Sequence, residues 1–293
     1  MSAKGRPERE HRSATRDGFP GSASVDVDAI ATRLIDAYDR AVTLPPITAA
    51  QPGFDVAAAY DVLAEIERRR IDAGWRPVGR KIGFTNRTLW ERYGVDRPMA
   101  ARIWSHTLHF AGDARATLSL APFVQPRIEP EVVFGLASPP PATDDPHAIL
   151  AAVEWIAPGF EIVQSHFPDW KFSAADCTAA FGLHGALVVG ARLRLDDGLR
   201  AALAERLPRF VLTLSRSDAA VERGVGANVL GSPALALAHL ARSLRSLPQF
   251  PPLAAGEVIT TGTITDAWPV APGETWRSDY GTLGIGGLEL SFR

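Results

Sequence analysis

Cysteine is almost absent from this chain, which has Cys177 alone among its 293 residues. A single cysteine excludes an intrachain disulfide framework and a cysteine-rich zinc cluster. No apolar run approaches the roughly 20 residues that a membrane-spanning helix requires. The N-terminal region also lacks the apolar centre of a secretory signal. These absences predict a cytoplasmic protein without a membrane partner.

Excess charge of one sign is also missing. The formal net charge is −2, and basic and acidic residues are interspersed along the chain. No basic stripe with interleaved aromatic residues is present, so we expect no nucleic-acid partner. The 46% hydrophobic and 22% charged composition is that of a globular protein. The length allows one large domain or two ordinary ones.

Lysine is scarce, since it occurs only at positions 4, 81 and 171 while arginine supplies most of the positive charge. Lys81 lies in a strand-like segment between Gly79 and Gly83. Lysine is a compact charge whose pKa shifts readily on burial. Two readings follow: Lys81 was selected for its chemistry, or it is a stray surface lysine.

The first 76 residues divide into a leader and a helical layer. Residues 1–24 are polar and predict a disordered leader. Apolar residues at helical spacing predict helices over 25–42 and 55–70, the second capped by Asp55. We therefore expect an N-terminal helical layer over residues 25–76.

Residues 77–293 predict one domain of short strands separated by glycine and proline. The predicted strands are 77–84, 101–109, 124–136, 155–164, 185–195, 209–216, 257–264 and 274–292. The predicted helices are 145–153, 168–180 and 232–246. Regular strand–helix alternation is poor, so the fold class is α+β with a mixed, largely antiparallel sheet that curls on itself. Phosphate-binding glycine loops and the G-x-S-x-G and H-E-x-x-H motifs are absent.

Two carboxylates stand out in the segment 124–134. Glu129 and Glu131 are two residues apart, so in an extended chain both point to one face. Like charges on an apolar strand repel each other and lose hydration, and a cation most often offsets that cost. Oxygen ligands favour a hard ion such as Mg²⁺, Mn²⁺ or Ca²⁺. The alternative is a solvated outer face on which Arg127 pairs with the acids.

A third acid, Glu161, is isolated among apolar residues in the segment 155–163. A carboxylate in such surroundings is costly unless it is exposed, neutralised or bound to a cation. If the two acidic strands are neighbours, three carboxylates converge and leave positions open for water and substrate.

Seven short motifs occur in an order that resembles a known enzyme family. They are Gly79–Gly83, Gly94-Val-Asp-x-Pro98, Gln125-Pro-Arg-Ile-Glu129-x-Glu131, Glu161-Ile-Val-x-Ser165, Asp169-Trp170, Leu230-Gly-x-Pro233 and Ala254-x-Gly-Glu257. The set resembles the 2-keto-4-pentenoate hydratase/4-oxalocrotonate decarboxylase family of the fumarylacetoacetate hydrolase superfamily. The resemblance extends from about residue 55 to the C-terminus, and it implies a fumarylacetoacetate hydrolase C-terminal-like fold.

The resemblance also implies a metal and a substrate class. Mg²⁺ or Mn²⁺ would be held by Glu129, Glu131 and Glu161, and Lys81 matches the family's active-site lysine. The substrate would be a 2-oxo acid that chelates the ion. The ion and the ammonium would then stabilise the negative charge that develops on the 2-oxo group. The family also implies a homo-oligomer, with a complex between homologous hydratase and decarboxylase subunits as a further option.

The chain departs from the family pattern at several positions. Met99 stands where the hydratases have an aspartate, and the decarboxylases resemble this chain more closely there. The run 261–273 is also similar to the decarboxylase version. Ala180 and Phe181 replace an Asp-Asn pair, and His184 is new. The exact substrate therefore stays open.

Asp176 and His184 are further catalytic candidates. Asp176 could orient Lys81 or a water molecule, and its alternative is an acid on a helix surface. His184 has an ordinary pKa near neutrality and could act as a general acid or base. Its alternative is a buried histidine hydrogen-bonded to backbone. The hydroxyls and backbone of Thr261, Gly262 and Thr263 are candidates for binding a substrate carboxylate.

The leading functional hypothesis is a metal-dependent hydratase acting on an unsaturated 2-oxo acid, in the catabolism of aromatic or similar compounds. Decarboxylation of a 2-oxo-3-enedioate is the first alternative. An acylpyruvate C–C hydrolase and a metal-binding partner subunit without activity are the others.

Overall fold

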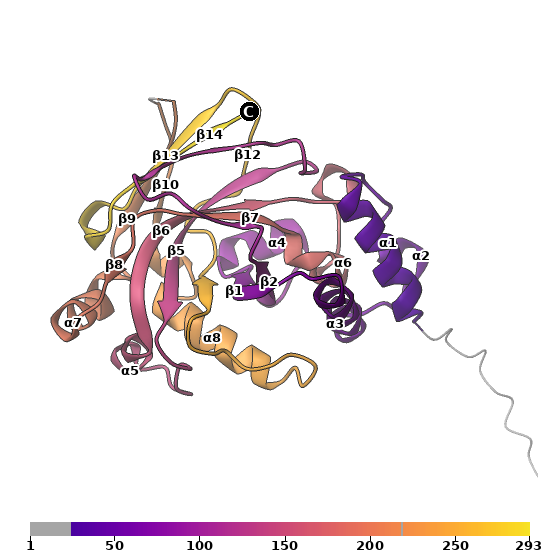
Figure 1. Ribbon diagram of the computed structural model, residues 1–293, viewed down its shortest axis with the longest axis horizontal. Coiled ribbons are helices and arrows are strands. Elements are labelled where there is room, and N and C mark those ends of the chain that lie inside the picture. Colours follow the sequence, from indigo (N-terminus) through magenta and orange to yellow (C-terminus); the bar gives the residue numbers. More distant parts are fainter. Residues whose placement is uncertain (1–24, 218) are drawn as a thin grey trace, which may run out of the picture.

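Two β-sheets form the centre of the protein (Figure 1). The computed structural model describes residues 25–217 and 219–293, so the predicted leader 1–24 lies outside the described residues. The larger sheet has nine strands in the order β2-β1-β11-β5-β6-β7-β3, with β12 beside β5 and β8 beside β6. Its strands are β1 (Pro77–Gly83), β2 (Met99–Trp104), β3 (Leu108–Phe110), β5 (Arg127–Leu136), β6 (Val153–Val163), β7 (His184–Val189), β8 (Leu193–Arg194), β11 (Val258–Thr260) and β12 (Trp268–Pro269).

The second sheet has five strands in the order β10-β9-β13-β14-β4. They are β4 (Arg115–Leu118), β9 (Val211–Arg216), β10 (Ala219–Val225), β13 (Thr275–Asp279) and β14 (Leu288–Phe292). Most pairs in both sheets are antiparallel, and the parallel ones are β1–β11, β3–β7 and β4–β14. The predicted mixed, largely antiparallel sheet is confirmed.

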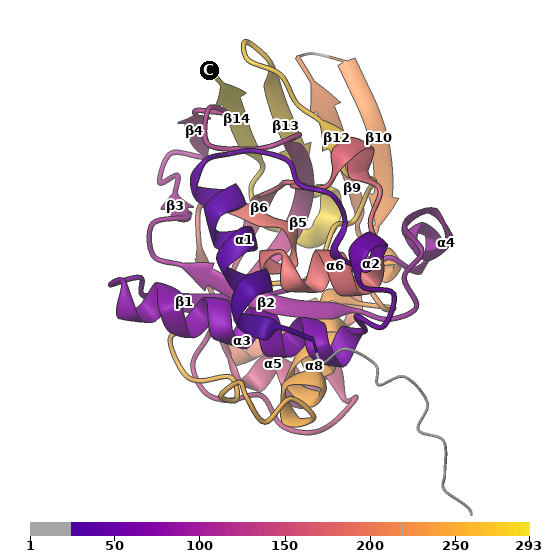
Figure 2. The same ribbon diagram turned by 90° about the vertical axis from the view of Figure 1, so that its right-hand side faces the viewer.

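Four helices form a layer on one side of the larger sheet (Figure 2). They are α1 (Val27–Asp39), α2 (Ile47–Ala50), α3 (Val56–Asp72) and α6 (Ala174–Ala179). The carboxylates of Asp26 and Asp55 cap α1 and α3 by accepting hydrogen bonds from backbone N–H groups of the first turn. These helices share a hydrophobic cluster that includes Leu34 and Ile66. The N-terminal helices therefore pack onto the sheet domain through α6 and also directly through α3, whose Tyr60 hydroxyl accepts a hydrogen bond from the backbone N–H of Ala100 on β2 at 3.2 Å. A domain boundary at residue 76 stays a prediction.

The other helices cover a different part of the sheet. They are α4 (Trp90–Tyr93), α5 (Pro146–Ala151), α7 (Asp197–Arg206) and α8 (Pro233–Arg245). Single 3-10 turns span Arg87–Leu89, Pro168–Trp170, Phe181–Leu183, Gly226–Asn228 and Gly281–Leu283. Ser232 caps helix α8, which packs against β1, β2 and α5. Among the described residues, no helix combines the length and apolar character needed to cross a bilayer.

Several predicted elements are shorter or divided. The strand predicted over 257–264 ends at Thr260, because Gly262 adopts φ +97° and turns the chain. The segment 101–109 divides into β2 and β3, 185–195 into β7 and β8, and 274–292 into β13 and β14. The helix predicted over 168–180 is regular only over Ala174–Ala179. Strands β4, β10 and β12 and helices α2, α4 and α7 were not predicted.

Candidate functional site

Three carboxylates gather where β5 and β6 lie side by side. The antiparallel register places Glu129 opposite Glu161, and Glu131 follows two residues along on the same face of β5. One carboxylate oxygen from each residue lies within 4.8 Å of the other two. Glu131 and Glu161 are fully buried, so the reading of a solvated outer face is wrong. Arg127, expected to pair with the acids in that reading, donates instead to the hydroxyl of Tyr93 at 2.9 Å.

The buried oxygens of this cluster are only partly satisfied. The backbone N–H of Gly262 donates to Glu131 Oε2 at 2.6 Å, and His184 Nδ1 lies 2.7 Å from Glu161 Oε1. The Lys81 ammonium is 3.2 Å from Glu161 Oε2. Neither this oxygen nor Glu131 Oε1 accepts a well-directed hydrogen bond from any described residue. Two buried carboxylate oxygens without a well-directed hydrogen bond fit a site for a hard cation.

The electrostatics of the cluster point the same way. Burial raises the pKa of Glu129 to about 7, although Lys81 opposes the shift. Burial, together with repulsion from the other two carboxylates, holds the pKa of Glu131 well above its usual range. Burial also opposes ionisation of Glu161, but Lys81 and His184 outweigh it and lower its pKa to about 2. One of the three acids is therefore ionised and two are poised to lose protons to a metal ion.

Lys81 is buried beside these acids. It is 2% exposed, so the reading of a stray surface lysine is wrong. Burial disfavours its ammonium, but attraction from Glu161, Glu129 and Glu131 is stronger in sum and raises the pKa of Lys81. Its neighbour Arg80 points to the opposite face of β1 and pairs with Glu257 at 3.0 Å. Because side chains alternate along β1, Lys81 faces the carboxylate cluster and Arg80 faces Glu257 on the other side of the strand.

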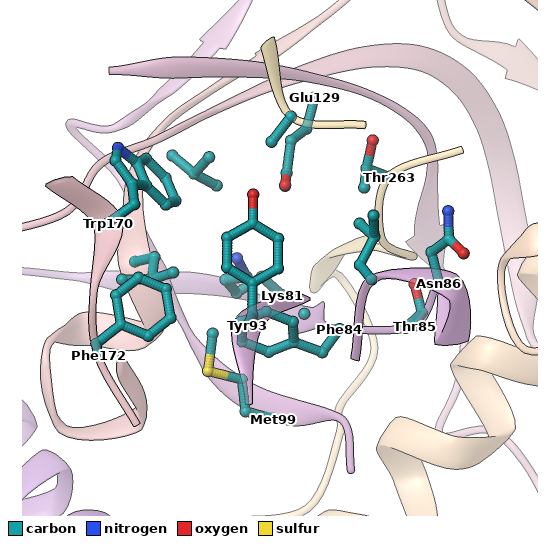
Figure 3. A pocket seen from close by; sticks show the side chains of 15 residues that line it. Lys81, Phe84, Thr85, Asn86, Tyr93, Met99, Glu129, Trp170, Phe172 and Thr263 are labelled. Carbon is teal, nitrogen blue, oxygen red and sulfur yellow. The ribbon is translucent and has the colours of Figure 1, made fainter. Parts of the chain in front are cut away.

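A pocket opens onto Lys81 and Glu129 (Figure 3). It encloses roughly 460 Å³ of space between atoms, part of it open to solvent. Its lining residues are Lys81, Gly83, Phe84, Thr85, Asn86, Leu89, Tyr93, Met99, Glu129, Val163, Trp170, Phe172, Leu183, Thr263 and Ala267. In Figure 3 the polar Thr85, Asn86 and Thr263 lie on one side, and Trp170 and Phe172 lie on the other.

His184 lies behind the carboxylates and is not among the described residues that line the pocket. Its Nδ1 faces Glu161, and its Nε2 lies 2.8 Å from Thr107 Oγ1. The ring is therefore held between two side chains, which corrects the expectation of a buried histidine bonded to backbone. Such a histidine orients a carboxylate and fixes its hydrogen-bond pattern.

Asp176 lies in the helical layer and is bonded to α2. Its carboxylate is fully buried, so the reading of a helix-surface acid is wrong. It accepts hydrogen bonds from the backbone and hydroxyl of Thr48 at 3.0 and 2.6 Å. It also closes a capping box with Ser173 at the start of α6. These bonds join α2 to α6, and a catalytic role for Asp176 stays a prediction without a contact that supports it among the described residues.

Of the three residues that follow β11, Thr261 and Gly262 bond to β5, and Thr263 lines the pocket. The Thr261 hydroxyl donates to Val132 O at 2.9 Å and is buried. Gly262 donates to Glu131, and a Cβ at Gly262 would lie 1.7 Å from Thr85 Oγ1. Of the three, Thr263 lines the pocket. Binding of a substrate carboxylate by this segment stays a prediction.

Sequence reasoning missed Thr85 and Tyr93. Thr85 is 1% exposed and lines the pocket, and its hydroxyl has no hydrogen-bond partner among the described residues. Its position four residues after Lys81 was the available signal. Tyr93 lines the pocket from α4, and its ring stacks on Phe172 at 6.0 Å. No pattern around Tyr93 marks it, because α4 is a single turn.

The curled mixed sheet, with three acidic side chains and a lysine gathered beside a pocket, can be compared with known protein families. Residues 91–290 match the fumarylacetoacetate (FAA) hydrolase C-terminal family. The chain belongs to this family, and the resemblance inferred from the sequence motifs is confirmed.

Particular relatives narrow the comparison. The chain is 32% identical over 264 residues to a 2-hydroxyhexa-2,4-dienoate hydratase of Comamonas testosteroni, covering 89% of this chain and 95% of that protein. It is 33% identical over 262 residues to a 4-oxalocrotonate decarboxylase of a Pseudomonas species, covering 88% of this chain and 95% of that protein. Among solved structures, the 4-oxalocrotonate decarboxylase of Pseudomonas putida G7, complexed with magnesium and adipate, superimposes with a TM-score of 0.81. It is 26% identical, and the match covers 97% of this chain and 100% of that chain.

Proposed function

We propose that this protein is a divalent-metal-dependent lyase acting on an unsaturated 2-oxo acid, with hydration as its leading activity. The observation that carries the proposal is the buried cluster of Glu129, Glu131 and Glu161 beside Lys81 at the pocket. Relatives similar over nearly nine-tenths of the chain are hydratases and a decarboxylase, which supports the same reaction class.

Glu129, Glu131 and Glu161 would hold the ion, and Mg²⁺ or Mn²⁺ suits this donor set. All three donors are carboxylate oxygens, and two of those oxygens lack hydrogen-bond partners among the described residues. When bound, the ion would supply Lewis-acid polarisation of the 2-oxo group. The solved relative that carries magnesium supports this choice.

The chain's own residues would handle charge and orientation. The Lys81 ammonium would stabilise negative charge that develops on the substrate's 2-oxo oxygen. The free hydroxyl of Thr85 is placed to donate a hydrogen bond to an anionic substrate. His184 would keep Glu161 in its ligating orientation, and Gly262 would do the same for Glu131.

Decarboxylation of a 2-oxo-3-enedioate is the second candidate. A solved relative that matches 97% of this chain is a 4-oxalocrotonate decarboxylase, and apolar Met99 occupies the pocket position expected to hold an acid in the hydratases. Both reactions would use the same metal and lysine, and they would differ in the group that handles the proton. A homo-oligomer, a complex with a homologous hydratase or decarboxylase, the C–C hydrolase and the inactive partner subunit stay predictions, as does the cytoplasmic location.

Two assays with Mg²⁺ test the proposal. Loss of dienol absorbance from 2-hydroxypenta-2,4-dienoate measures hydration, and carbon dioxide release from a 2-oxo-3-enedioate measures decarboxylation. We expect Lys81→Ala to lower kcat by about 10²–10⁴-fold, as removal of a principal charge-stabilising group does, while Mg²⁺ still binds.

The exposed Lys171, which pairs with Asp169 at 3.7 Å, provides the matched control. Lys171→Ala should retain full activity. Glu131→Gln should abolish both Mg²⁺ binding and turnover, and normal activity in that variant would refute the proposed site. Absence of turnover in the unaltered protein with Mg²⁺ bound would favour the inactive partner subunit.

A further inference from the structure

The pocket has a polar end and an apolar remainder. Beyond Lys81, Glu129 and the polar group of Thr85, Asn86 and Thr263, its wall consists of carbon-rich side chains. These are Phe84, Leu89, Tyr93, Met99, Val163, Trp170, Phe172, Leu183 and Ala267. Figure 3 shows Trp170 and Phe172 across the pocket from the polar group. A 2-oxo acid held at the polar end would extend its tail among these side chains.

Positive charge is confined to the polar end. Among the described residues that line the pocket, Lys81 is the one cation, and its ammonium already faces three carboxylates. The nearby Arg127 lies behind the wall, with its guanidinium 4.2 Å from the centre of the Trp170 ring. Its Nη1 donates to the Tyr93 hydroxyl at 2.9 Å. Among the described residues that line the pocket, none therefore offers a second carboxylate a cation that is free of other partners.

The lining of the pocket favours an apolar substrate tail over one that ends in a carboxylate. A carboxylate moved from water into an apolar wall loses hydration and gains no partner, which is strongly unfavourable. A flat, unsaturated hydrocarbon tail gains from leaving water and from contact with aromatic faces. The rings of Tyr93, Phe172 and Trp170, which all line the pocket, offer such a tail aromatic surface.

We propose that this pocket selects 2-oxo acids whose only charge is the carboxylate next to the 2-oxo group, with an uncharged, apolar tail, and that it rejects 2-oxo dicarboxylic acids. This inference rests on the proposed function, because the metal and Lys81 must hold the 2-oxo carboxylate. It narrows the choice between the two candidate reactions: the substrate is the uncharged-tail dienoate of a hydratase, and the enedioate of a decarboxylase is excluded.

The test compares two acids of equal length. 2-Oxohexanoate and 2-oxoadipate both have six carbons, and they differ in a terminal methyl against a terminal carboxylate. Their dissociation constants are measured by calorimetry with the full chain and saturating Mg²⁺. We expect 2-oxohexanoate to bind at least about 100-fold more tightly, since a desolvated carboxylate without a partner costs several kcal/mol. Equal or tighter binding of 2-oxoadipate overturns the inference.

The two proposals fail in different ways. If 2-oxoadipate binds well and binding requires Mg²⁺, the specificity inference falls and the proposed function stands. If neither acid binds in a Mg²⁺-dependent way, the proposed function falls and the inference falls with it. Loss of 2-oxoadipate binding in Arg127→Gln would identify that guanidinium as the missed partner, and it would also overturn the inference.

A variant pair separates the pocket wall from general repulsion of dianions. Phe172→Arg places a cation in the wall and should shift the preference at least about tenfold toward 2-oxoadipate, as a charge-assisted contact does. Phe110→Arg adds the same charge at an exposed position on β3 and should leave the preference unchanged. Equal shifts in both variants would mean that overall charge, and not the wall, sets the selectivity.

Discussion

At the scale of single residues, the site depends on second partners that hold the acids in place. Glu161 receives His184 on one oxygen and faces Lys81 with the other. Glu131 receives the Gly262 N–H, and the carbonyl of Glu131 accepts from the buried Tyr280 hydroxyl at 2.5 Å. The carboxylates of Glu131 and Glu161 are thus oriented before any ion binds, which lowers the entropic cost of assembling a site.

His184 is expected to act through Glu161 and not on the substrate. His184→Ala should weaken Mg²⁺ binding by about 10–100-fold, as loss of a partner behind a metal ligand does, while kcat at saturating Mg²⁺ stays close to normal. Calorimetry with Mg²⁺ and kcat measured against metal concentration check this. His109→Ala, at an exposed position on β3, is the control. A large loss of kcat that excess Mg²⁺ cannot restore would instead make His184 a general acid or base.

At the scale of elements, the β5–β6 pair and the turn after β11 bring the site together. The ladder from Arg127 to Leu136 places the acidic faces of both strands in register. Strand β11 lies between β1 and β5, so its C-terminal turn reaches both Lys81's strand and Glu131. Glu257 immediately precedes β11 and is 177 residues from Arg80 in sequence. Because β11 is the parallel neighbour of β1, Glu257 accepts a hydrogen bond from Arg80 on the face of β1 opposite Lys81.

The turn at Gly262 gives a prediction at this scale. Gly262→Ala should destabilise the protein by more than the roughly 1 kcal/mol that a left-handed backbone alone costs an alanine. The added Cβ would also meet Thr85 Oγ1 at 1.7 Å. Gly273→Ala isolates the backbone cost, because Gly273 has a similar φ of +87° and open space around it. Denaturant unfolding of both variants checks this, and equal losses would contradict it.

Local sequence patterns predict most of the helices and strands of this fold. They do not predict which strands pair or in what register. Alternation over 77–84 separates Lys81 from Arg80, and the spacing of Glu129 and Glu131 places both on one face. Nothing local specifies that Glu161 lies opposite Glu129, because register depends on residues 32 positions apart. His184's partner Thr107 is 77 residues away. Helix α7 was missed although Asp196 caps it, since its apolar face is short.

At the scale of the whole molecule, the large sheet buries an acidic cluster that opposes folding until protons or a metal neutralise it. The carboxyls of Glu129 and Glu131 have raised pKa values, so the folded protein holds protons that the unfolded chain releases near pH 4.5. The metal-free protein should therefore lose the stability contributed by Glu129 as the pH rises from about 4.5 through 7, and the contribution of Glu131 falls from the same lower pH up to its own raised pKa. Glu161, whose pKa is about 2, stays ionised throughout and does not contribute to this window.

Mg²⁺ should reverse that trend. Because the ion must displace protons from Glu129 and Glu131, its affinity should rise by up to about tenfold per pH unit for each proton released. The increase in Tm on adding Mg²⁺ should accordingly be larger at pH 8 than at pH 6. Thermal unfolding with Mg²⁺ and with a chelator at both values measures this difference. In Glu129→Gln the dependence should become shallower, and an unchanged dependence would place the titrating group elsewhere.

Cys177 lies fully buried in α6, and burial holds the pKa of its thiol well above the usual range. A thiol reagent can therefore label the protein only when the segment around α6 opens transiently to solvent. Because the chain has one sulfhydryl, the labelling rate reports on a single location, without background from other sites. The labelling rate of Cys177 therefore measures how often the α6 segment, which packs against both α3 and β2, opens to solvent.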